Sequence, residues 1–327
     1  MPWSEGLNHE QDFMTVRRPK IGWVLVILLV ISSIATLATR PKARSYTWVK
    51  LAETQHQEIQ FHNSQQNLDL AGLLFLPEEN DQAPGVVIIH GSGPSIRDNG
   101  WYITLVKYLQ DHGVVVLLPD KRGSEQSGGQ WLTASFDDLA TDTMAGVEWL
   151  MQHPSVDPKK IGVVGLSEGG HIAPVAANQI PELAFVVSIV SSAIPMHELL
   201  VYEENYNLRE FGIPPGLSNI FAYVGAWSLI YARQKDHWDA IGNYDPAPDW
   251  SKVSIPALAL FGEEDTNVPS VRSAKVLRSL GNTNIETKIY PGSGHALQSP
   301  EGQGTSIFRE DALVEIVSFI NRTDRID

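Results

Sequence analysis

A serine placed between two glycines is the residue of this sequence best suited to nucleophilic chemistry. The stretch KKIGVVGLSEGG runs from an apolar segment into Ser167, with Gly165 two residues before it and Gly169 two residues after it. A sharp turn from a strand into a helix strains the residue at the bend and crowds its neighbours, so glycine fits at both positions. The hydroxyl is then exposed above the sheet, and the amide of Glu168 points toward an oxyanion on the substrate. The pattern predicts that Ser167 attacks a carbonyl carbon.

A serine nucleophile needs a general base, and three of the ten histidines are candidates. His295 lies in YPGSGHAL, directly after the last predicted strand, where flexible glycines let the ring reach the strand edge. His171 follows Ser167 by about one helical turn, on the helix that leaves the bend, so we interpret it as a packing or supporting residue. His90 ends an earlier strand, and we interpret it as holding the loop that follows. We therefore predict that His295 is the base.

The base needs an acid that fixes its tautomer. The stretch ALALFGEEDTNVP places Glu263, Glu264 and Asp265 after a predicted strand. Asp265 lies deepest in the loop, and the two glutamates are better interpreted as solvated or helix-entry charges. The order Ser167, Asp265, His295 is the serine–acid–histidine order that accompanies this kind of nucleophile turn.

A second oxyanion donor should come from the loop after the first apolar strand of the parallel set. That loop is HGSGP at 90–94, and the backbone amides of Ser92 and Gly93 are the candidates. A glycine-rich loop also suggests phosphate binding. The sequence has no G-x-x-x-x-G-K-[ST] pattern here and no cation in the loop before Arg97, so we exclude that interpretation.

Short apolar strands alternate with helical segments along most of the chain. After a hairpin at 58–63 and 68–76, we predict strands at 86–89, 114–118, 161–166, 185–190, 257–261 and 285–290, and helices at 101–111, 136–152, 168–180, 271–280 and 309–321. This alternation indicates an α/β fold with a mostly parallel sheet and helices on both faces. Ligands of such sheets bind at the carboxyl ends of the strands, where the candidate residues all fall.

Residues 196–250 break the alternation and are rich in aromatic residues. We predict that they form a helical cap inserted into a core of residues 57–195 and 251–327, although a peripheral helical patch is the alternative. The aromatic residues are Tyr202, Tyr206, Phe211, Phe221, Tyr223, Trp227, Tyr231, Trp238, Tyr244 and Trp250.

Composition narrows the possible functions. The chain has 327 residues, 43% of them hydrophobic, which suits one large α/β domain with an insertion. A formal net charge of −14 argues against a nucleic-acid partner, because phosphate binding needs clustered Lys and Arg. The absence of cysteine excludes disulfides, thiolate metal sites and a cysteine nucleophile.

The N-terminus predicts membrane attachment. Residues 21–38 carry no charge and span roughly 27 Å as a helix, close to the hydrocarbon thickness of a bilayer. We expect a tail at 1–20, a transmembrane anchor at 21–38 and a tether or first strand at 39–56. The catalytic domain is then expected on the outer, periplasmic side. A cleaved signal peptide with secretion is the alternative.

These motifs resemble the α/β-hydrolase superfamily, and most closely its bacterial serine carboxylesterase and dienelactone-hydrolase-like branch, near the serine aminopeptidase-like families. The resemblance covers roughly residues 57–322, and its motifs are HGSGP at 90–94, DKRGSEQSGG at 120–129, GLSEGG at 165–170, GEEDTNVP at 262–269 and GSGH at 292–295. It implies no metal and no cofactor. It also implies a nucleophile, an acid, a base and oxyanion amides at Ser167, Asp265, His295, and near Ser92 and Glu168.

The predicted reaction is ester hydrolysis through an acyl-enzyme, with a small-molecule substrate that has an apolar acyl or aryl group. A peptidase or thioesterase with the same three residues is one alternative. A peptidase that binds a free amino terminus would need carboxylates, which Glu203 and Glu204 could supply, although paired surface glutamates are commoner. The other alternative is a membrane-tethered binding protein without catalytic activity. The sequence leaves the oligomeric state open.

Overall fold

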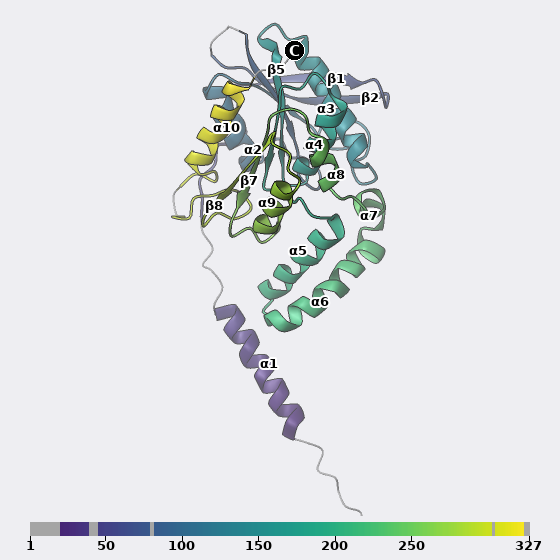
Figure 1. Cartoon of the computed structure of the whole chain (residues 1–327), viewed down its shortest axis with the longest axis vertical. Coiled ribbons are helices and arrows are strands. Elements are labelled where there is room, and N and C mark those ends of the chain that lie inside the picture. Colours follow the sequence, from purple (N-terminus) through teal and green to yellow (C-terminus); the bar gives the residue numbers. More distant parts are fainter. Residues whose placement is uncertain (1–19, 39–44, 79–81, 303–304, 324–327) are drawn as a thin grey trace, which may run out of the picture.

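The computed structural model describes residues 20–38, 45–78, 82–302 and 305–323, and Figure 1 shows their arrangement. One sheet has the strand order β1-β2-β4-β3-β5-β6-β7-β8. β1 and β2 pair antiparallel, β2 pairs antiparallel with β4, and the other neighbours pair parallel. The strands are β1 (Gln57–Asn63), β2 (Leu68–Phe75), β3 (Ala83–Ile89), β4 (Val115–Pro119), β5 (Val156–Leu166), β6 (Phe185–Ile189), β7 (Ala257–Gly262) and β8 (Ile285–Tyr290).

Helices cover both faces of the sheet, and each face has its own apolar core (Figure 1). On one face the strands pack against α2 (Gly100–Asp111) and α10 (Glu310–Arg322). On the other they pack against α3 (Phe136–Met151), α4 (Gly169–Gln179) and α9 (Ser270–Ser279). The inner strands are apolar on both sides because neither side meets water, as the sequence predicted. The predicted mostly parallel α/β sheet is therefore confirmed.

Most predicted element bounds differ from the structure by one residue at most, whereas β3 begins three residues earlier and β5 five residues earlier than predicted. β5 begins at Val156 and not at 161, because Ala83 of β3 pairs with Val156 before the register shifts. The sequence did not predict this extension, because residues Asp157 to Lys160 are polar and show no apolar strand pattern. α4 contains Pro174, and it begins one residue later than predicted.

For the segment before the hairpin we expected a tether or a first strand, and its described residues 45–56 form no strand, only an isolated parallel bridge between Thr47 and Ser306. It forms a short 3-10 helix, Leu51–Glu53, and lies against the body of the molecule. The amide of Val49 donates to Thr104 Oγ1 at 3.0 Å, and the amide of Leu51 donates to Asp98 Oδ1 at 2.7 Å. The part of the predicted tether at 39–44 lies outside the described residues.

Helices fill the predicted insertion between β6 and β7. They are α5 (Met196–Glu210), α6 (Pro215–Ser228), a π-helical turn (Leu229–Arg233), α7 (Lys235–Ile241) and α8 (Ala247–Lys252). We call residues 196–252 the helical insertion. Figure 1 shows α5, α6 and α7 at one end of the body, away from α3 and the β1–β2 hairpin.

A helix, α1 (Lys20–Ala38), precedes the body and projects away from it, with one end near α5 (Figure 1). Its apolar side chains are exposed, from Trp23 at 74% to Leu29 at 44%. Within the described ranges, no helix has the length and apolar content that crossing a membrane requires. The predicted tail lies outside the described residues except for Lys20.

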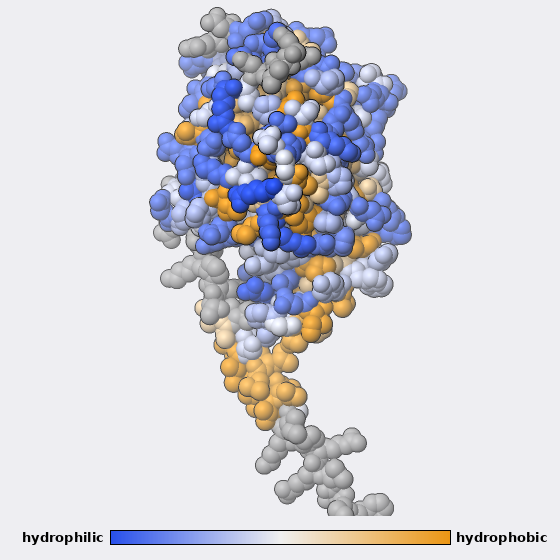
Figure 2. Space-filling model, in the orientation of Figure 1, coloured by the Kyte–Doolittle hydropathy of each residue, from blue (hydrophilic) through white to orange (hydrophobic). Residues whose placement is uncertain are grey.

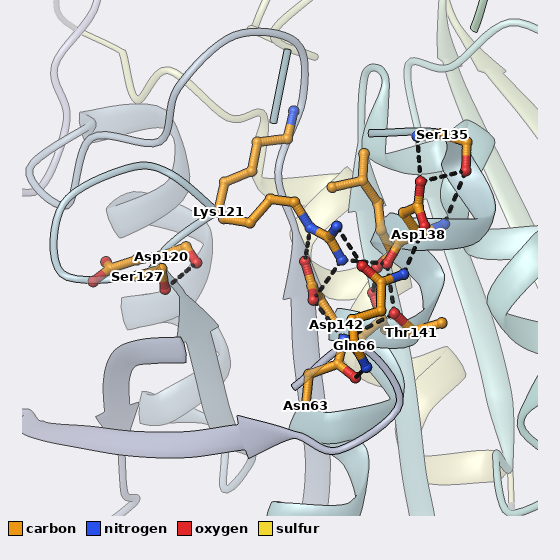
Figure 3. A network of polar contacts seen from close by, with 12 residues as sticks. Asn63, Gln66, Asp120, Lys121, Ser127, Ser135, Asp138, Thr141 and Asp142 are labelled. Atoms are coloured by element: carbon orange, nitrogen blue, oxygen red, sulfur yellow. Dashed lines mark hydrogen bonds and ion pairs between the residues drawn. The ribbon is translucent and has the colours of Figure 1, made fainter. Parts of the chain in front are cut away.

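A polar cluster anchors the loop that follows β4, as Figure 3 shows. The guanidinium of Arg122 donates to both carboxylate oxygens of Asp142 on α3, at 2.6 and 2.8 Å, and to Gln66 in the β1–β2 turn at 2.7 Å. Asn63 at the end of β1 also donates to Asp142, at 2.8 Å. The side chain of Lys121 points away from this cluster (Figure 3). The loop backbone is therefore held on one side while Lys121 extends to the other.

Candidate active site

The turn at Ser167 has the strained geometry that the sequence predicted. Ser167 follows β5 directly, and its φ of 54° lies in the left-handed region that favours glycine. A side chain at Gly165 would lie 2.2 Å from the carbonyl oxygen of Gly169, and one at Gly169 would lie 2.1 Å from that of Ile89. The strand and the helix approach too closely for any other residue at either position. The turn thereby lifts the serine hydroxyl off the end of the sheet.

The three side chains predicted from separate stretches of chain lie together. His295 Nε2 is 3.0 Å from Ser167 Oγ, and His295 Nδ1 is 2.9 Å from Asp265 Oδ2. The other carboxylate oxygen of Asp265 accepts from the amides of Asn267 and Val268, at 2.8 and 3.0 Å. The side chain of Asp265 is fully buried. The carboxylate is thus fixed in place, and it can hold the proton of the imidazole on Nδ1, leaving Nε2 to accept from the serine.

The other candidate acids and bases lie elsewhere. Glu263 and Glu264 are exposed, whereas Asp265 is buried. His90 Nε2 lies 2.8 Å from the carbonyl oxygen of Pro119, which ties the end of β3 to the end of β4. His171 is buried and stacks on Phe136 with ring centroids 5.7 Å apart. These positions agree with the supporting roles expected of His90 and His171.

The loop after β3 contains the two residues that were predicted to supply oxyanion amides. The amide of Gly91 is occupied, since it donates to the hydroxyl of Tyr102 at 2.7 Å. The next residues, Ser92 and Gly93, line the same pocket as Ser167 and Glu168. Gly93 has a φ of 79°, which only glycine adopts without strain. Ser92 and Gly93 therefore lie in the same pocket as Ser167, and their role as oxyanion donors stays a prediction.

A buried ion pair beneath the nucleophile was missed by the sequence analysis. Lys121 Nζ donates to Glu168 Oε1 at 2.8 Å and to the carbonyl oxygen of Gly91 at 2.7 Å. His237 Nε2, from α7 of the helical insertion, lies 3.6 Å from Glu168 Oε2. Burial alone would raise the pKa of Glu168, but Lys121 and His237 lower it to about 2. Lys121 therefore joins the oxyanion loop to the residue after the nucleophile.

The sequence contained enough to predict that Lys121 lies near the site. It belongs to DKRGSEQSGG, which directly follows a predicted strand and so falls at the ligand-binding edge of the sheet. The position of His237 could not be predicted in this way, because it lies in the helical insertion and follows no strand of the sheet.

The pocket above Ser167 has a volume of about 390 Å³, which suits a small molecule. The core supplies its floor with Ser92, Gly93 and Ser167, and the helical insertion supplies most of its wall. The apolar residues of that wall are Met196, Leu199, Leu200, Leu229, Trp238 and Ile241. Among the residues that the structure describes, no group of three or more His, Asp or Glu is arranged to hold a metal ion.

Comparison with known proteins gives two kinds of relative. The chain is 24% identical over 289 residues to the acylamino-acid-releasing enzyme of Rattus norvegicus, which covers 81% of this chain and 38% of that enzyme. It is 24% identical over 253 residues to esterase EstD of Thermotoga maritima, which covers 73% of this chain and 60% of EstD. The chain therefore spans less than two thirds of the length of both relatives.

Solved structures show the same fold. The Pyrococcus furiosus esterase Pf2001 matches with a TM-score of 0.64 and 21% identity, over 85% of this chain and 99% of that one. The Pyrococcus horikoshii acylaminoacyl peptidase matches with a TM-score of 0.57 and 19% identity, over 84% of this chain and 42% of that one. The predicted α/β-hydrolase superfamily is confirmed, and the esterases among these relatives support a serine-esterase-like branch.

The family match covers most of the catalytic body. Residues 101–317, about two thirds of the chain, match the Prolyl oligopeptidase family and include all three residues of the candidate site. The match supports the predicted serine hydrolase over a binding protein without activity. The chain belongs to the Prolyl oligopeptidase family.

Proposed function

We propose that the chain hydrolyses carboxylic esters through a covalent acyl-enzyme on Ser167. The observation that supports this most directly is the continuous contact from Ser167 through His295 to Asp265, at 3.0 and 2.9 Å. A lone serine hydroxyl is a weak nucleophile, and such an arrangement removes its proton as it attacks.

Each group then has one role in the reaction. His295 Nε2 takes the proton of Ser167 as the serine oxygen bonds to the ester carbonyl carbon. The amides of Glu168 and of Ser92 or Gly93 stabilise the resulting oxyanion, each by about 3 kcal/mol. His295 then gives the proton to the leaving alkoxide, and water removes the acyl group by the same steps in reverse.

The wall of the pocket favours an ester with an apolar acyl or aryl group. Side chains such as Leu199, Leu200 and Ile241 offer apolar contacts but few groups that would bind a peptide backbone. The esterases among the relatives agree with this choice. A peptidase is the second candidate, because acylaminoacyl peptidases are also among the relatives. A thioesterase with the same three residues stays a third, since the acyl-enzyme step is common to all three reactions.

A matched substrate series tests the proposal. Para-nitrophenyl hexanoate, the hexanoyl thioester of thiophenol and hexanoyl para-nitroanilide share one acyl group and differ in the bond that breaks. We expect the oxygen ester to have the highest kcat/KM relative to its rate in buffer, and Ser167→Ala to reduce that kcat by about 10⁶. Ser279→Ala, at an exposed position on α9, is the control. Faster turnover of the anilide, corrected in the same way, would assign a peptidase.

We also propose that the enzyme is held at a membrane through residues 21–38. Two observations support this. The described side chains of α1 are mostly apolar and exposed, and Figure 2 shows hydrophobic residues over α1 and along α6. α6 exposes Tyr223 at 68% and Trp227 at 61%, and such aromatic residues are frequent at membrane interfaces. The two apolar surfaces would then face one lipid layer.

Fractionation of cells that express the full chain tests this attachment. The wild type should stay in the membrane pellet after alkaline carbonate extraction. Replacing Leu28 and Ile31 of α1 by Glu should release it, because each buried charge opposes insertion. Val271→Glu alters an apolar residue that is 61% exposed on α9, and it should not release the protein. Wild-type protein in the soluble fraction would contradict the proposal.

A further inference from the structure

We propose that Lys121 is a positioning residue for the reaction at Ser167, because it turns the amide of Ser92 toward the oxyanion. Its ammonium group contacts the loop after β3 and the side chain of the residue that follows the nucleophile. The inference rests on the proposed ester hydrolysis. It also decides between two candidate donors, since it assigns the amide of Ser92 and not that of Gly93 to the oxyanion.

The first argument is the geometry of the peptide group that joins Gly91 to Ser92. Lys121 Nζ donates to the carbonyl oxygen of Gly91 at 2.7 Å. No peptide bond among the described residues is cis, and a trans group is planar, so the N–H of Ser92 points opposite to that carbonyl. Fixing the carbonyl on Lys121 therefore fixes the direction of the Ser92 N–H. The amide of Gly93 belongs to the next peptide group, so this contact does not orient it directly.

The same peptide group lies beside the nucleophile. A side chain at Gly91 would come within 3.2 Å of Ser167 Cβ, and Ser92 lines the pocket together with Ser167. On its other side, Gly91 donates its own amide to the hydroxyl of Tyr102 at 2.7 Å. The peptide groups on both sides of Gly91 are thus tied, which leaves the Ser92 amide little freedom to rotate.

The second argument is that Lys121 also holds the residue that carries the other predicted donor. Lys121 Nζ donates to Glu168 Oε1 at 2.8 Å, and the backbone amide of Lys121 donates to Ser95 Oγ at 2.9 Å. The side chain of Lys121 is 5% exposed, so water competes little for these hydrogen bonds. One residue therefore fixes two donor-bearing segments relative to each other. Donors that are held in place before the reaction stabilise an oxyanion without reorganisation.

The alternative is that Lys121 only neutralises the buried carboxylate of Glu168. Neutralisation alone does not need the contact with the carbonyl oxygen of Gly91. A cation on that oxygen also polarises the peptide group and makes the N–H of Ser92 a stronger donor. Because Lys121 and Glu168 carry opposite charges, the pair adds little net charge near the oxyanion. Its effect on the reaction should therefore come from the orientation and polarisation of the Ser92 amide.

The next residue in the chain provides a matched control. Arg122 is also a buried cation in the loop after β4, and it donates to both carboxylate oxygens of Asp142 at 2.6 and 2.8 Å. Figure 3 shows the side chain of Lys121 extending away from Asp142. Arg122→Met should therefore weaken the fold without altering the oxyanion site, whereas Lys121→Met should do both.

Steady-state kinetics with para-nitrophenyl hexanoate separate the two roles. Lys121→Met should lower kcat by roughly 10–100-fold with KM within about twofold, because the lost contact acts in the transition state. Arg122→Met should keep kcat within about threefold although its urea midpoint falls. Adding Glu168→Gln to Lys121→Met should raise the urea midpoint but not kcat, since the carbonyl of Gly91 still lacks its cation. Lys121→Arg keeps the cation and should recover part of kcat.

A transition-state analogue adds a readout that a purely structural role would not alter. Ser167 Oγ bonds to the carbonyl carbon of trifluoromethyl hexyl ketone, the serine proton passes to His295 Nε2, and the carbonyl oxygen becomes an oxyanion. The Ki of this ketone should rise in Lys121→Met by the factor by which kcat/KM falls. Methyl hexyl ketone stays a carbonyl compound, and its Ki should not change. An equal rise for both ketones would show a collapsed pocket and overturn the positioning role.

A measurement on the wild type does not depend on how the variants fold. With ¹⁵N-labelled serine and glycine, the amide proton of Ser92 should move downfield when the trifluoromethyl ketone adduct forms, because it then binds an oxyanion. A larger shift at Gly93 would overturn the assignment. Unchanged kcat in Lys121→Met would overturn the positioning role and leave the proposed ester hydrolysis intact. Absence of turnover in the wild type would overturn both.

Discussion

The end of the sheet and the helical insertion differ in what they supply to the pocket around Ser167. At the sheet, Asp265 accepts three hydrogen bonds, and the amide of Gly91 is already taken by Tyr102. In the helical insertion, by contrast, the residues that line the pocket are mostly apolar, among them Leu199, Trp238 and Ile241. The difference indicates that the sheet positions the candidate catalytic groups, while the insertion shapes the pocket around them.

Two contacts join these regions. The hydroxyl of Tyr202 on α5 donates to the carbonyl oxygen of Asp265 at 2.8 Å, and His237 on α7 lies next to Glu168. Movement of the helical insertion would therefore shift the loop that contains Asp265 and also Glu168, the residue after Ser167. Substitutions in the two regions should therefore separate their contributions to turnover and to stability.

The largest effect is expected at the sheet, from Asp265→Asn. The amide cannot hold the imidazole proton on Nδ1, so kcat should fall by roughly 10⁴ while the protein stays folded. Stopped-flow kinetics and circular dichroism would measure the two quantities. Glu263→Gln, two residues earlier and exposed, is the matched control and should stay near the wild type. A loss below tenfold for Asp265→Asn would transfer the acid role to another carboxylate.

The second effect is a loss of stability when the buried ion pair of Lys121 and Glu168 is broken. Lys121→Met leaves Glu168 buried without a counter-charge and should reduce the free energy of unfolding by about 3–5 kcal/mol. Adding Glu168→Gln should recover part of this loss, because the uncompensated charge is removed. Urea denaturation measures both values.

The surface pair of Lys288 and Glu315 provides the comparison for that measurement. Lys288 is 44% exposed, and Lys288→Met should cost no more than about 1 kcal/mol. Equal losses for Lys121→Met and Lys288→Met would show that the buried pair is no more important than an exposed one.

The smallest expected effect is a change in the free energy of unfolding with pH, which we attribute to His171 on α4. Burial lowers the pKa of His171 to about 4, although the charge of Glu168 opposes the shift. An unfolded histidine binds a proton below a pH of about 6.5, so the unfolded state takes up protons first as the pH falls. Stability should therefore decrease between pH 7 and pH 5, with His171 accounting for about 2 kcal/mol.

His171→Leu isolates this contribution. Its free energy of unfolding should decrease less than that of the wild type over the same pH range, by about 2 kcal/mol. Urea titrations at both pH values give the comparison. Identical decreases for the two proteins would show that His171 is not held neutral in the folded state.

The sequence predicted the sheet side of this comparison far better than the insertion side. The turn at Ser167, the acid loop and the loop of His295 each follow an apolar strand, and the carboxyl ends of parallel strands meet at one edge. Periodicity and chain order therefore sufficed to place them near one another. Contacts such as that of His237 with Glu168 depend on how α7 packs, which no local pattern specifies. Glu203 and Glu204 were noticed as a pair, but only the fold brings them into the pocket.

The most direct test of the central claim is covalent labelling with a fluorophosphonate, followed by peptide mapping. We predict a single adduct on Ser167, which is absent in Ser167→Ala and forms much more slowly in Asp265→Asn. An adduct on a different serine, or no adduct on a folded protein, would contradict it.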